Sequence, residues 1–408
     1  MINNGKLNKK VLILTSTFPR WKGDATPSFV LDFCKNILPF TEGINVLAPH
    51  FNGAKNQEDI EGVRVRRYRY WWPASGQNIA YEGGAVSKAK KSLLYALKLK
   101  FLLLSLFFNT LYQALRYKPV INAHWLIPQG FIAIVVKILT RRKVVITVHG
   151  SDVFALNHKL LLKVKRFVLK RADEVVVNSS ATKEACQAIY TDRDYHVIPM
   201  GVDIENMFVK KEKDDALKSQ LGIEGFTVLF VGRLSEEKGE IYLCEAMKRL
   251  AAEDSNTKLL IVGDGPEKHN LKKYIRDNNL TKNIVIIGWV AQSELVNYYT
   301  LADVFAGPSI ESEQGLREAF GLVFVEALAT GTPVIATNTG GIPDIVQDGH
   351  NGFLVKQQDS DAIADKLLLL KNDDSLRVKL SENSQDYVLK KFSWNTVSQK
   401  YKKILFKD

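Results

Sequence analysis

Short apolar runs recur along the whole chain and alternate with longer segments in which apolar residues return at helical spacing. In the first half, the strand candidates are residues 11–15, 44–49, 63–70, 120–124, 143–150, 174–179 and 196–199. In the second half, they are residues 226–232, 258–265, 284–290, 304–309, 333–338 and 352–355. Several are β-branched runs without alternation, which is typical of strands buried on both faces of a parallel sheet. The pattern predicts two successive doubly wound α/β domains.

The chain length of 408 residues agrees with two domains. A highly charged stretch at 210–220 follows a Pro-Met-Gly turn, so we expect the boundary within 201–222. We assign residues 1–205 to the first domain and 206–391 to the second. The helical pattern in 392–408 comes after the second domain is complete, and it could pack back on the first.

One segment, residues 88–118, does not resemble an ordinary crossover helix. Residues 101–115 are uncharged and mostly apolar, a run shorter than the roughly 20 residues that span a bilayer. At helical spacing, Lys91, Lys98 and Arg116 fall on one face. The segment is either a long helix buried against the sheet or a basic amphipathic helix in a membrane interface. The Arg, Tyr and Trp residues of 64–72 favour the membrane interface.

The net charge of +12 is unevenly distributed. Residues 1–200 contain 30 Lys and Arg against 13 Asp and Glu, a net of +17, so the remainder of the chain carries −5. A strongly basic half indicates an anionic partner, either nucleic acid or an anionic membrane surface. We find no nucleic-acid-binding motif, which disfavours nucleic acid. Incidental charge is the remaining alternative.

Three widely spaced cysteines (Cys34, Cys186 and Cys244) argue against a disulfide framework and a cysteine zinc site, and they fit a reducing compartment. The N-terminal residues run directly into the first strand candidate, so we expect no secretion signal. We find no Asp-x-Asp motif and no His/Cys cluster for a metal.

The densest group of candidate site residues lies in 311–346. Glu318 and Glu326 are separated by seven residues, and a helix beginning near Gly321 places Glu318 before it and Glu326 within it. The free backbone N–H groups of residues 320–323 could then bind phosphate. In doubly wound domains ligands bind at the carboxyl ends of strands, where this group is expected.

A second group follows the strand candidate 226–232. Arg233 comes directly after that strand, and Lys238 lies at the start of the next helix, beside Gly239. Two cations at a strand end suit a diphosphate in the absence of a metal. Residues 263–266 form a further tight turn, and the backbone of 287–290 could meet a planar base.

Together these motifs resemble the retaining glycosyltransferases of the GT-B fold, in glycosyltransferase family 4, the glycosyl transferases group 1. The resemblance covers nearly the whole chain. In the second half it rests on the Glu-x7-Glu pair, 232–239, 263–266, Pro308-Ser309 and 331–355. In the first half it rests on 124–125, 148–152 and 199–203.

The resemblance implies two Rossmann-like domains facing a central cleft, the first binding the acceptor and the second the nucleotide sugar. The residues implied in catalysis are His124, Arg233, Lys238 and Glu318. Those implied in donor binding are Gly23, Gly232, Arg233, Lys238, Gly263, Ile287, Val290, Glu318, Phe320, Gly321, Leu322 and Glu326. His149 and Asp152 are expected to line the acceptor side.

Within this set, Arg233 and Lys238 would hold the diphosphate, and Glu326 would bind the ribose. Two segments depart from the usual pattern. The loop 16–29 contains Gly23 alone where the family often has a Gly-Gly pair, although we still expect it to meet donor phosphate or acceptor. The acidic insert 311–315 could influence the choice of donor sugar.

The implied reaction moves a hexose-type sugar from a UDP- or GDP-sugar to a hydroxyl of a lipid-linked or membrane-proximal glycan acceptor, with retention and without a metal or cofactor. The leaving phosphate would take the acceptor proton. Such an enzyme would assemble cell-surface polysaccharide or glycolipid in the cytoplasm, at the inner face of the plasma membrane. A nucleotide-sugar 2-epimerase of similar fold is the alternative, which the Glu-x7-Glu pattern disfavours.

Overall fold

The computed structural model describes residues 9–24, 26–81, 92–155 and 158–407, and these form two compact units. Unit 1 contains the described residues up to Asn178, together with Thr182–Met200 and the residues from Val397 onward. Unit 2 contains Ser179–Ala181 and Gly201–Thr396. The chain therefore passes into unit 2 at 200/201, where the sequence predicted 205/206.

Unit 1 is built on an eight-stranded sheet with the order β3-β4-β2-β1-β5-β6-β7-β8. Its strands are β1 (Lys10–Leu14), β2 (Gly43–Pro49), β3 (Gln57–Ile60), β4 (Val63–Tyr68), β5 (Val120–His124), β6 (Val144–Val148), β7 (Glu174–Val177) and β8 (His196–Val197). All neighbours pair in parallel except β3, which pairs antiparallel with β4 at the sheet edge. The central strands are buried along their length, as their unbroken apolar sequences predicted.

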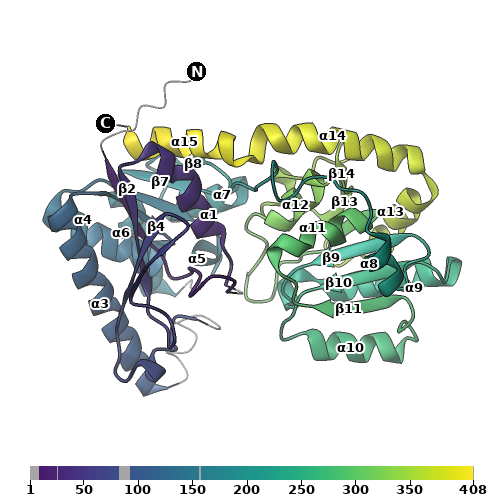
Figure 1. Ribbon diagram of the computed structural model, residues 1–408, viewed down its shortest axis with the longest axis horizontal. Helices are drawn as coiled ribbons and strands as arrows, with labels where there is room; N and C mark the ends of the chain where they lie inside the picture. Colours follow the sequence, from purple (N-terminus) through teal and green to yellow (C-terminus); the bar gives the residue numbers. More distant parts are fainter. Residues whose placement is uncertain (1–8, 25, 82–91, 156–157, 408) are drawn as a thin grey trace. The chain divides into compact units, whose positions relative to one another are not determined.

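The helices of unit 1 cover both faces of this sheet. They are α1 (Phe29–Ile37), α3 (Leu93–Tyr117), α4 (Phe131–Thr140), α5 (Ser151–Phe154), α6 (Lys159–Arg171), α7 (Ser180–Ile189) and most of α15 (Trp394–Phe406). Helix α4 packs between α3 and α6 (Figure 1). Because crossovers are right-handed, α1, which leads from β1 outward to β2, lies on the opposite face.

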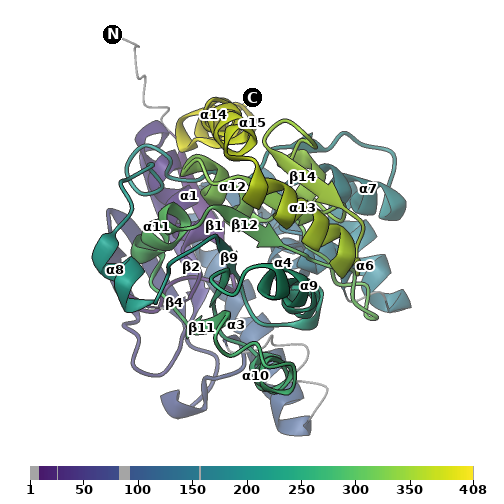
Figure 2. The same ribbon diagram turned by 90° about the vertical axis from the view of Figure 1, so that its right-hand side faces the viewer.

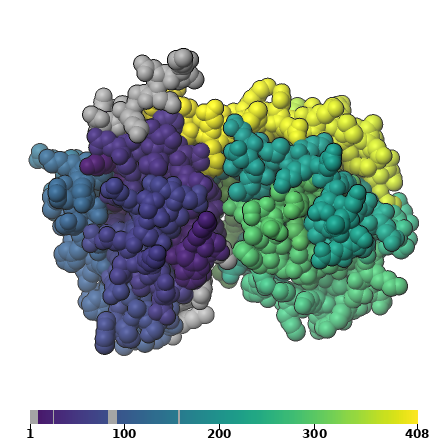
Figure 3. Space-filling view, in the orientation of Figure 1, coloured from purple at the N-terminus to yellow at the C-terminus, as the bar shows by residue number. Residues whose placement is uncertain are grey.

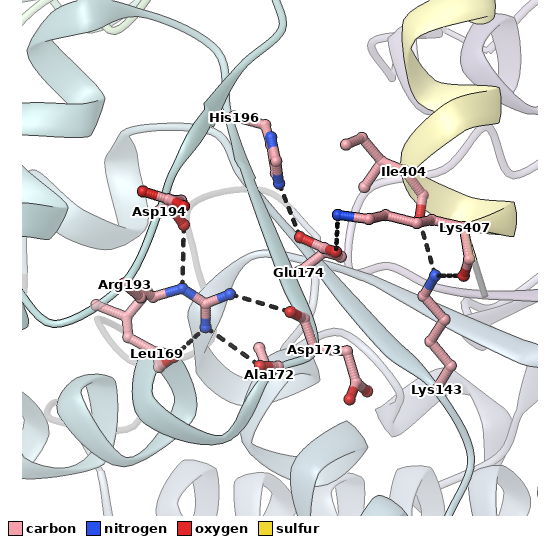
Figure 4. Close-up of polar contacts among 10 residues, drawn as sticks. All are labelled: Lys143, Leu169, Ala172, Asp173, Glu174, Arg193, Asp194, His196, Ile404 and Lys407. Carbon is pink, nitrogen blue, oxygen red and sulfur yellow. Dashed lines mark hydrogen bonds and ion pairs between the residues drawn. The ribbon is translucent and has the colours of Figure 1, made fainter.

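Helix α15 belongs to unit 1 although it follows the whole of unit 2 in sequence. The Tyr401 ring lies 4.8 Å from the Phe33 ring of α1, centroid to centroid. At the end of the helix, Lys143 Nζ donates to the Ile404 carbonyl at 3.0 Å and also to that of Lys407 (Figure 4). Lys407 in turn lies 3.9 Å from Glu174. These contacts attach the helix to the starts of β6 and β7.

Unit 2 contains a six-stranded parallel sheet with the order β11-β10-β9-β12-β13-β14. Its strands are β9 (Thr227–Val231), β10 (Lys258–Val262), β11 (Ile284–Gly288), β12 (Val304–Gly307), β13 (Val334–Thr337) and β14 (Gly352–Val355). Its helices are α8 (Asp215–Gln220), α9 (Glu240–Glu253), α10 (Lys268–Asp277), α11 (Gln292–Leu301), α12 (Leu322–Ala329), α13 (Ser360–Asn372) and α14 (Asp374–Phe392). The sequence predicted all six strands.

The core of unit 2 lies between the sheet and the helices α9, α10 and α13, which contribute buried residues such as Met247, Ile275 and Leu367. Figure 2 shows α9 and α13 side by side. On the other face, α12 packs against α11 and α14. This burial fixes the sheet, so the strand ends that carry the candidate site residues are rigidly placed.

The structure corrects the predicted orientation of the helix in 88–118. Lys98, assigned to an outward basic face, is 6% exposed. Its ammonium group lies 3.3 Å from Asn78 Oδ1 and within 5.6 Å of the ring centroids of Trp71 and Tyr95. Cation–π attraction and this hydrogen bond hold Lys98 against the rest of unit 1. Arg116 is exposed, and Lys91 lies outside the described residues.

Candidate functional site

In unit 2, the predicted donor residues lie where parallel strands end. Strand β9 ends at Val231, and a 3-10 turn, Glu236–Lys238, then leads to α9. Gly239 joins the two with a φ of 65°, and a Cβ there would come 2.1 Å from the Pro308 carbonyl oxygen. Only glycine fits this close approach, so the turn that carries Lys238 packs directly on the segment after β12.

Lys238 and Glu318 form an ion pair with a distance of 2.5 Å between Nζ and Oε2. Their side chains are 24% and 12% exposed. Burial raises the pKa of Glu318, but the Lys238 ammonium outweighs it and holds that pKa below its usual value. Burial lowers the pKa of Lys238, and Glu318 reverses the effect and raises it. Both groups are therefore charged at neutral pH, side by side at the edge of the sheet.

The loop that carries Glu318 is closed by the Gly340-Gly341 turn after β13. Gly341 N donates to the Glu318 carbonyl at 3.0 Å, and a Cβ on Gly340, whose φ is 55°, would come 1.8 Å from the same oxygen. Phe320 N lies 3.4 Å from Glu318 Oε1, while the Phe320 ring packs inward against Phe392. The backbone of this loop, rather than the Phe320 side chain, thus faces the site.

Helix α12 begins directly after Gly321, which has a φ of 95°, so Leu322 is its first residue. Glu326 lies in the middle of this helix and is 5% exposed. The Tyr299 hydroxyl donates to Glu326 Oε2 at 2.9 Å. Burial and the adjacent Glu326 carboxylate together raise the pKa of Tyr299 well above its usual value. Tyr299 orients Glu326, and no motif of the sequence indicated it.

The remaining predicted donor residues lie at the ends of β9, β10 and β11. Gly232 N donates to Val262 O at 3.0 Å, and Gly263 N donates to Gly288 O at 2.7 Å. The register between β10 and β11 shifts at Ile261/Val262, which brings Gly288 opposite the end of β10. These bonds hold three successive strand ends together.

Arg233 is exposed, and it has no ion-pair partner among the residues that the structure describes. Its guanidinium is therefore available to an anionic ligand beside Gly232. Ile287 and Val290 are partly exposed on and just after β11. The structure thus brings Lys238 and Glu318 into direct contact, while Arg233, just after the end of β9, has no ion-pair partner among the described residues.

Glu240, the first residue of α9, was not predicted from the sequence. It is 3% exposed, and neither of its carboxylate oxygens has a hydrogen-bond partner in the described part of the chain. Burial, with smaller contributions from Glu267 and Glu237, raises its pKa to about 7. No motif of the sequence distinguishes Glu240 from the other Glu and Lys residues of 236–240.

In unit 1, the two predicted histidines form a pair at the ends of neighbouring strands. His124 Nδ1 lies 2.8 Å from His149 Nε2, and the rings are stacked with an interplanar angle of 15°. Burial, followed by repulsion from His149, lowers the pKa of His124 well below its usual value, and burial lowers the pKa of His149 to about 3. The pair is neutral at physiological pH. His124 Nε2 has no hydrogen-bond partner among the described residues.

Asp152 holds the turns that follow the two histidine strands. Its Oδ2 accepts from Leu126 N at 2.7 Å, and its Oδ1 accepts from Gly150 N at 3.1 Å. The side chain is buried, and this burial raises the pKa of Asp152 despite the backbone hydrogen bonds. Its carboxylate therefore positions backbone beside the histidine pair. Asn178, which the sequence did not indicate, holds the His149 carbonyl at 3.1 Å.

Gly23, with a φ of 79°, lies in the loop after β1. This loop is closed by Arg20 and Asp24, whose side chains meet through Nε···Oδ2 and Nη2···Oδ1 contacts of 2.9 and 2.6 Å. Burial raises the pKa of Asp24, but hydrogen bonds from Arg20 lower it to about 2 overall. The Arg20 guanidinium also lies 4.6 Å from the Phe51 ring centroid. The loop is thus preformed, with Gly23 exposed at its tip.

A metal site is not evident in the described part of the chain, where no three His, Cys, Asp or Glu side chains come together in a group that could hold a metal ion. All three cysteines are buried and unpaired.

Two family models match the chain. Residues 213–387 match the model described as Glycosyl transferases group 1, and residues 44–206 match the model described as Glycosyltransferase Family 4. The first match contains the ion pair of unit 2, and the second contains the histidine pair of unit 1.

Two curated relatives extend the match across both regions. The chain is 31% identical over 265 residues to the GDP-mannose-dependent alpha-(1-6)-phosphatidylinositol monomannoside mannosyltransferase of Mycobacterium tuberculosis, covering 63% of this chain and 68% of the relative. It is 27% identical over 293 residues to the N-acetyl-alpha-D-glucosaminyl L-malate synthase of Bacillus anthracis, covering 70% of this chain and 74% of the relative.

Among solved structures, the crystal structure of Anabaena HepE in complex with UDP is similar, with a TM-score of 0.75 and 22% sequence identity, over 97% of this chain and 99% of that chain. At this identity the likeness establishes the fold. The predicted fold class, a GT-B protein with two Rossmann-like domains, is confirmed.

Proposed function

From the premise that this chain belongs to the glycosyl transferases group 1 family, we propose that it transfers a hexose-type sugar from a UDP- or GDP-sugar to a hydroxyl of a lipid-linked or membrane-proximal glycan acceptor. The observation that carries the proposal is the charged Lys238–Glu318 pair, with unpaired Arg233 at the neighbouring strand end. A pair of cations beside a helix N-terminus suits a nucleotide diphosphate.

In this proposal, Arg233 and Lys238 bind the diphosphate and stabilise the negative charge that develops on it as the sugar departs. The first amides of α12, with Gly321 and Leu322, and the Glu318 carboxylate bind the donor sugar. When the donor binds, the contact between Lys238 and Glu318 weakens. Lys238 then binds the diphosphate, and Glu318 binds the sugar.

The nucleoside is held by the neighbouring elements. Glu326, oriented by Tyr299, accepts hydrogen bonds from the ribose hydroxyls. Ile287 and Val290 flank the base, and Gly232 and Gly263 allow close approach of the backbone to the phosphates. Arg233 and Lys238 would replace the positive charge of a metal ion, so we expect the enzyme to remain active in the presence of a chelator.

The acceptor is assigned to unit 1, where His124 and His149 offer a neutral, partly enclosed pair suited to an uncharged hydroxyl. In the proposed reaction, the acceptor oxygen bonds to the anomeric carbon on the face from which the diphosphate leaves. The departing phosphate oxygen takes the acceptor proton. The bond count balances without a protein base, and the configuration is retained.

We assign the protein to the inner face of the plasma membrane, in the synthesis of cell-surface polysaccharide or glycolipid. The phosphatidylinositol acceptor in the name of the mycobacterial relative supports a membrane-bound acceptor. The α linkages in the names of both relatives agree with retention.

The test measures nucleotide binding first and transfer second. UDP and GDP are compared for stabilisation of the protein against heat, because a ligand that binds the native state raises its Tm. We expect one of them to stabilise the wild type and Arg233→Ala to lose most of this effect and most of its turnover. Arg249→Ala, an exposed arginine of the same unit, is the matched control.

Near-normal turnover in Arg233→Ala would contradict the diphosphate assignment. Incubation with a nucleotide sugar and no acceptor distinguishes a glycosyltransferase from a nucleotide-sugar 2-epimerase, because only the epimerase would produce an epimerised nucleotide sugar. The anomeric configuration of the product, read by NMR, tests retention.

A further inference from the structure

Helix α3 exposes large apolar side chains, whereas a surface helix of a water-soluble domain turns its apolar face inward. Its buried face mixes the polar Lys98, Thr110 and Gln113 with Leu102, Leu106 and Ala114. Its outward face is a stripe of large apolar side chains, each at least 42% exposed: Leu93, Leu94, Leu97, Phe101, Leu104, Phe108, Tyr112 and Leu115. We call this the α3 stripe. At 100° per residue these positions fall within about a quarter of the helix circumference.

By length and composition alone, α3 is the one helix in the described residues that could cross a bilayer. However, its other face packs against β2, β4 and α4 and includes the buried Lys98 ammonium. Figure 3 shows the blue segment that contains α3 and α4 at the surface of unit 1. Since 22% of its most apolar window is buried, α3 is not a core helix either. Among the described residues, Trp71 contacts the stripe at Phe101 and Arg66 contacts it at Tyr112, and the stripe otherwise remains exposed.

A basic groove of 420 Å³ adjoins the C-terminal end of α3. It lies where β1, β5 and β6 begin, whereas the histidine pair lies at the opposite, carboxyl ends of β5 and β6. One carboxylate, that of Glu42, lines it together with six cationic residues: Lys9, Lys10, Lys118, Arg141, Arg142 and Lys143. Tyr117, which also lines the groove, is the last residue of α3, so the groove lies at the end of the helix that carries the stripe. At 100° per residue, Tyr117 itself falls on the opposite face of α3 from the stripe.

The cations of the basic groove are only partly explained by the fold. Lys118 and Arg141 follow the C-terminal ends of α3 and α4, where helix carbonyls attract positive charge. Lys9, Lys10 and Lys143 come from the starts of strands; Lys143 Nζ donates to the carbonyls of Ile404 and Lys407 at the end of α15, and the Lys10 ammonium lies 5.7 Å from the Tyr117 ring centroid. Burial lowers the pKa of Lys143, and attraction from Glu174 and Asp173 opposes repulsion from Lys9 and Lys407. An anion in the groove would relieve this repulsion.

We propose that the α3 stripe and the basic groove form one docking surface for an anionic phospholipid bilayer, with the stripe in the acyl boundary and lipid phosphates in the groove. Charge complementarity selects this occupant: between Glu82 and Asp152 the sequence contains no Asp or Glu, while Lys100 and Arg116 flank the stripe. A second copy of the chain would bring like charges together. Its biological purpose rests on the proposed function.

Docking in this manner has a consequence for the acceptor. Helix α3 is tied to the loop after β4, because Ser105 Oγ donates to Arg69 O at 2.6 Å and the Trp71 and Phe101 rings lie 5.8 Å apart. That loop follows the carboxyl end of β4, and His124 lies at the carboxyl end of β5, which runs in the same direction. Trp72, 86% exposed within it, suits the lipid interface. A docked α3 therefore holds the acceptor-binding edge of unit 1 at the membrane.

The experiment is flotation of the full chain with vesicles of phosphatidylcholine alone or mixed equally with phosphatidylglycerol. We expect binding to the anionic vesicles. Phe101→Glu/Phe108→Glu should weaken it about tenfold or more, and Lys118→Glu/Arg141→Glu should remove the preference for phosphatidylglycerol. Leu389→Glu in α14 and Lys163→Glu in α6 are single changes of the same two kinds, apolar to acidic and basic to acidic, at exposed positions elsewhere, and these variants should bind as the wild type.

UDP- or GDP-induced stabilisation, measured on the same preparations, shows that each variant is folded. Equal flotation of both double variants and the wild type would overturn the proposal. So would a wild-type dimer in light scattering that Phe101→Glu/Phe108→Glu converts to monomer without vesicle binding. Stabilisation by inorganic phosphate that requires Lys118 and Arg141, without vesicle binding, would also overturn it. Arg233→Ala should still float with anionic vesicles. The flotation result therefore tests membrane docking independently of the proposed donor site.

Discussion

The candidate site residues of the two units differ in charge although both units place them at the carboxyl ends of parallel strands. Unit 2 offers a charged pair, Lys238 and Glu318, and an unpaired Arg233. Unit 1 offers two imidazoles whose burial keeps them neutral. Strand ends of the same kind of fold can therefore carry either charged or neutral side chains. A buried ionisable group stays charged when an oppositely charged partner lies beside it and becomes neutral when none does. This division agrees with the charged donor and the uncharged acceptor hydroxyl of the proposed reaction.

Removal of a cation from the charged site should have the largest effect. Lys238→Ala eliminates one of the two groups proposed to stabilise the leaving diphosphate, and we expect kcat to fall roughly 100- to 1,000-fold. Steady-state kinetics measures this. Lys268→Ala removes a lysine with an exposed Asp264 partner in the same unit and should retain full activity. A modest change in Lys238→Ala would remove the contrast between the two units.

Glu240 provides a test of pH dependence in unit 2. Its pKa is about 7 in the folded protein against 4.5 as the ordinary value, so the folded state holds the proton more tightly than the unfolded state. Stability should therefore fall as pH rises from about 4.5 to 7 and stay low above that range. Glu240→Gln mimics the protonated form and should stabilise the protein at pH 8 by up to about 3 kcal/mol. At pH 5 the variant should resemble the wild type in urea unfolding; equal gains at both pH values would exclude titration of Glu240.

The histidine pair predicts the opposite pH dependence. The pKa of His149 is about 3 in the folded protein against 6.5 ordinarily, so the unfolded state binds more protons between these values. Stability should therefore be complete above pH 6.5 and fall as pH decreases, by about 1.4 kcal/mol per pH unit from this residue. His149→Asn should flatten the slope by that amount, as measured by urea unfolding between pH 5 and 7. An unchanged slope would mean that His149 ionises in the folded state.

The smallest effect is expected for Tyr299→Phe. This change removes one hydrogen bond to Glu326, worth about 1 kcal/mol, without emptying the space of the ring. We expect KM for the donor to rise about fivefold and kcat to change little, since the ribose is remote from the reacting atoms. Tyr298→Phe, on the adjacent and partly exposed residue, serves as the control. A fall in kcat alone would assign Tyr299 a different role.

The strands were predictable because their β-branched, unbroken apolar runs specify burial on both faces. Strand β3 was missed because its sequence, QEDI, is polar and pairs only at an edge. Helix α3 was recognised as unusual, but Lys98 was assigned to the wrong surface. Periodicity shows which residues share a face and not which face is packed, and here Trp71 and Asn78, which lie outside the helix, hold Lys98 on the packed face.

The motifs singled out Arg233, Lys238 and Glu318, and the structure places all three in segments that follow strands β9 and β12; that they bind a diphosphate stays a prediction. The direct contact between Lys238 and Glu318 was not predicted, because 80 residues separate them and the Gly239 and Gly340 turns set the distance. Tyr299 and Glu240 lie outside the motifs, and their roles follow from tertiary packing alone. The stacking of His124 on His149 likewise depends on the register of β5 and β6.

Helix α15 makes the order of synthesis part of the folding of unit 1. All of unit 2 leaves the ribosome before Val397. Until then, Phe33 lacks its contact with the Tyr401 ring, and Lys143 lacks its hydrogen bond to the Ile404 carbonyl. Domains usually fold as they emerge, from the N-terminal end. Here the earlier-made domain is completed after the later-made one. A nascent chain of this protein therefore carries an unfinished, partly apolar unit for the whole time in which unit 2 is translated.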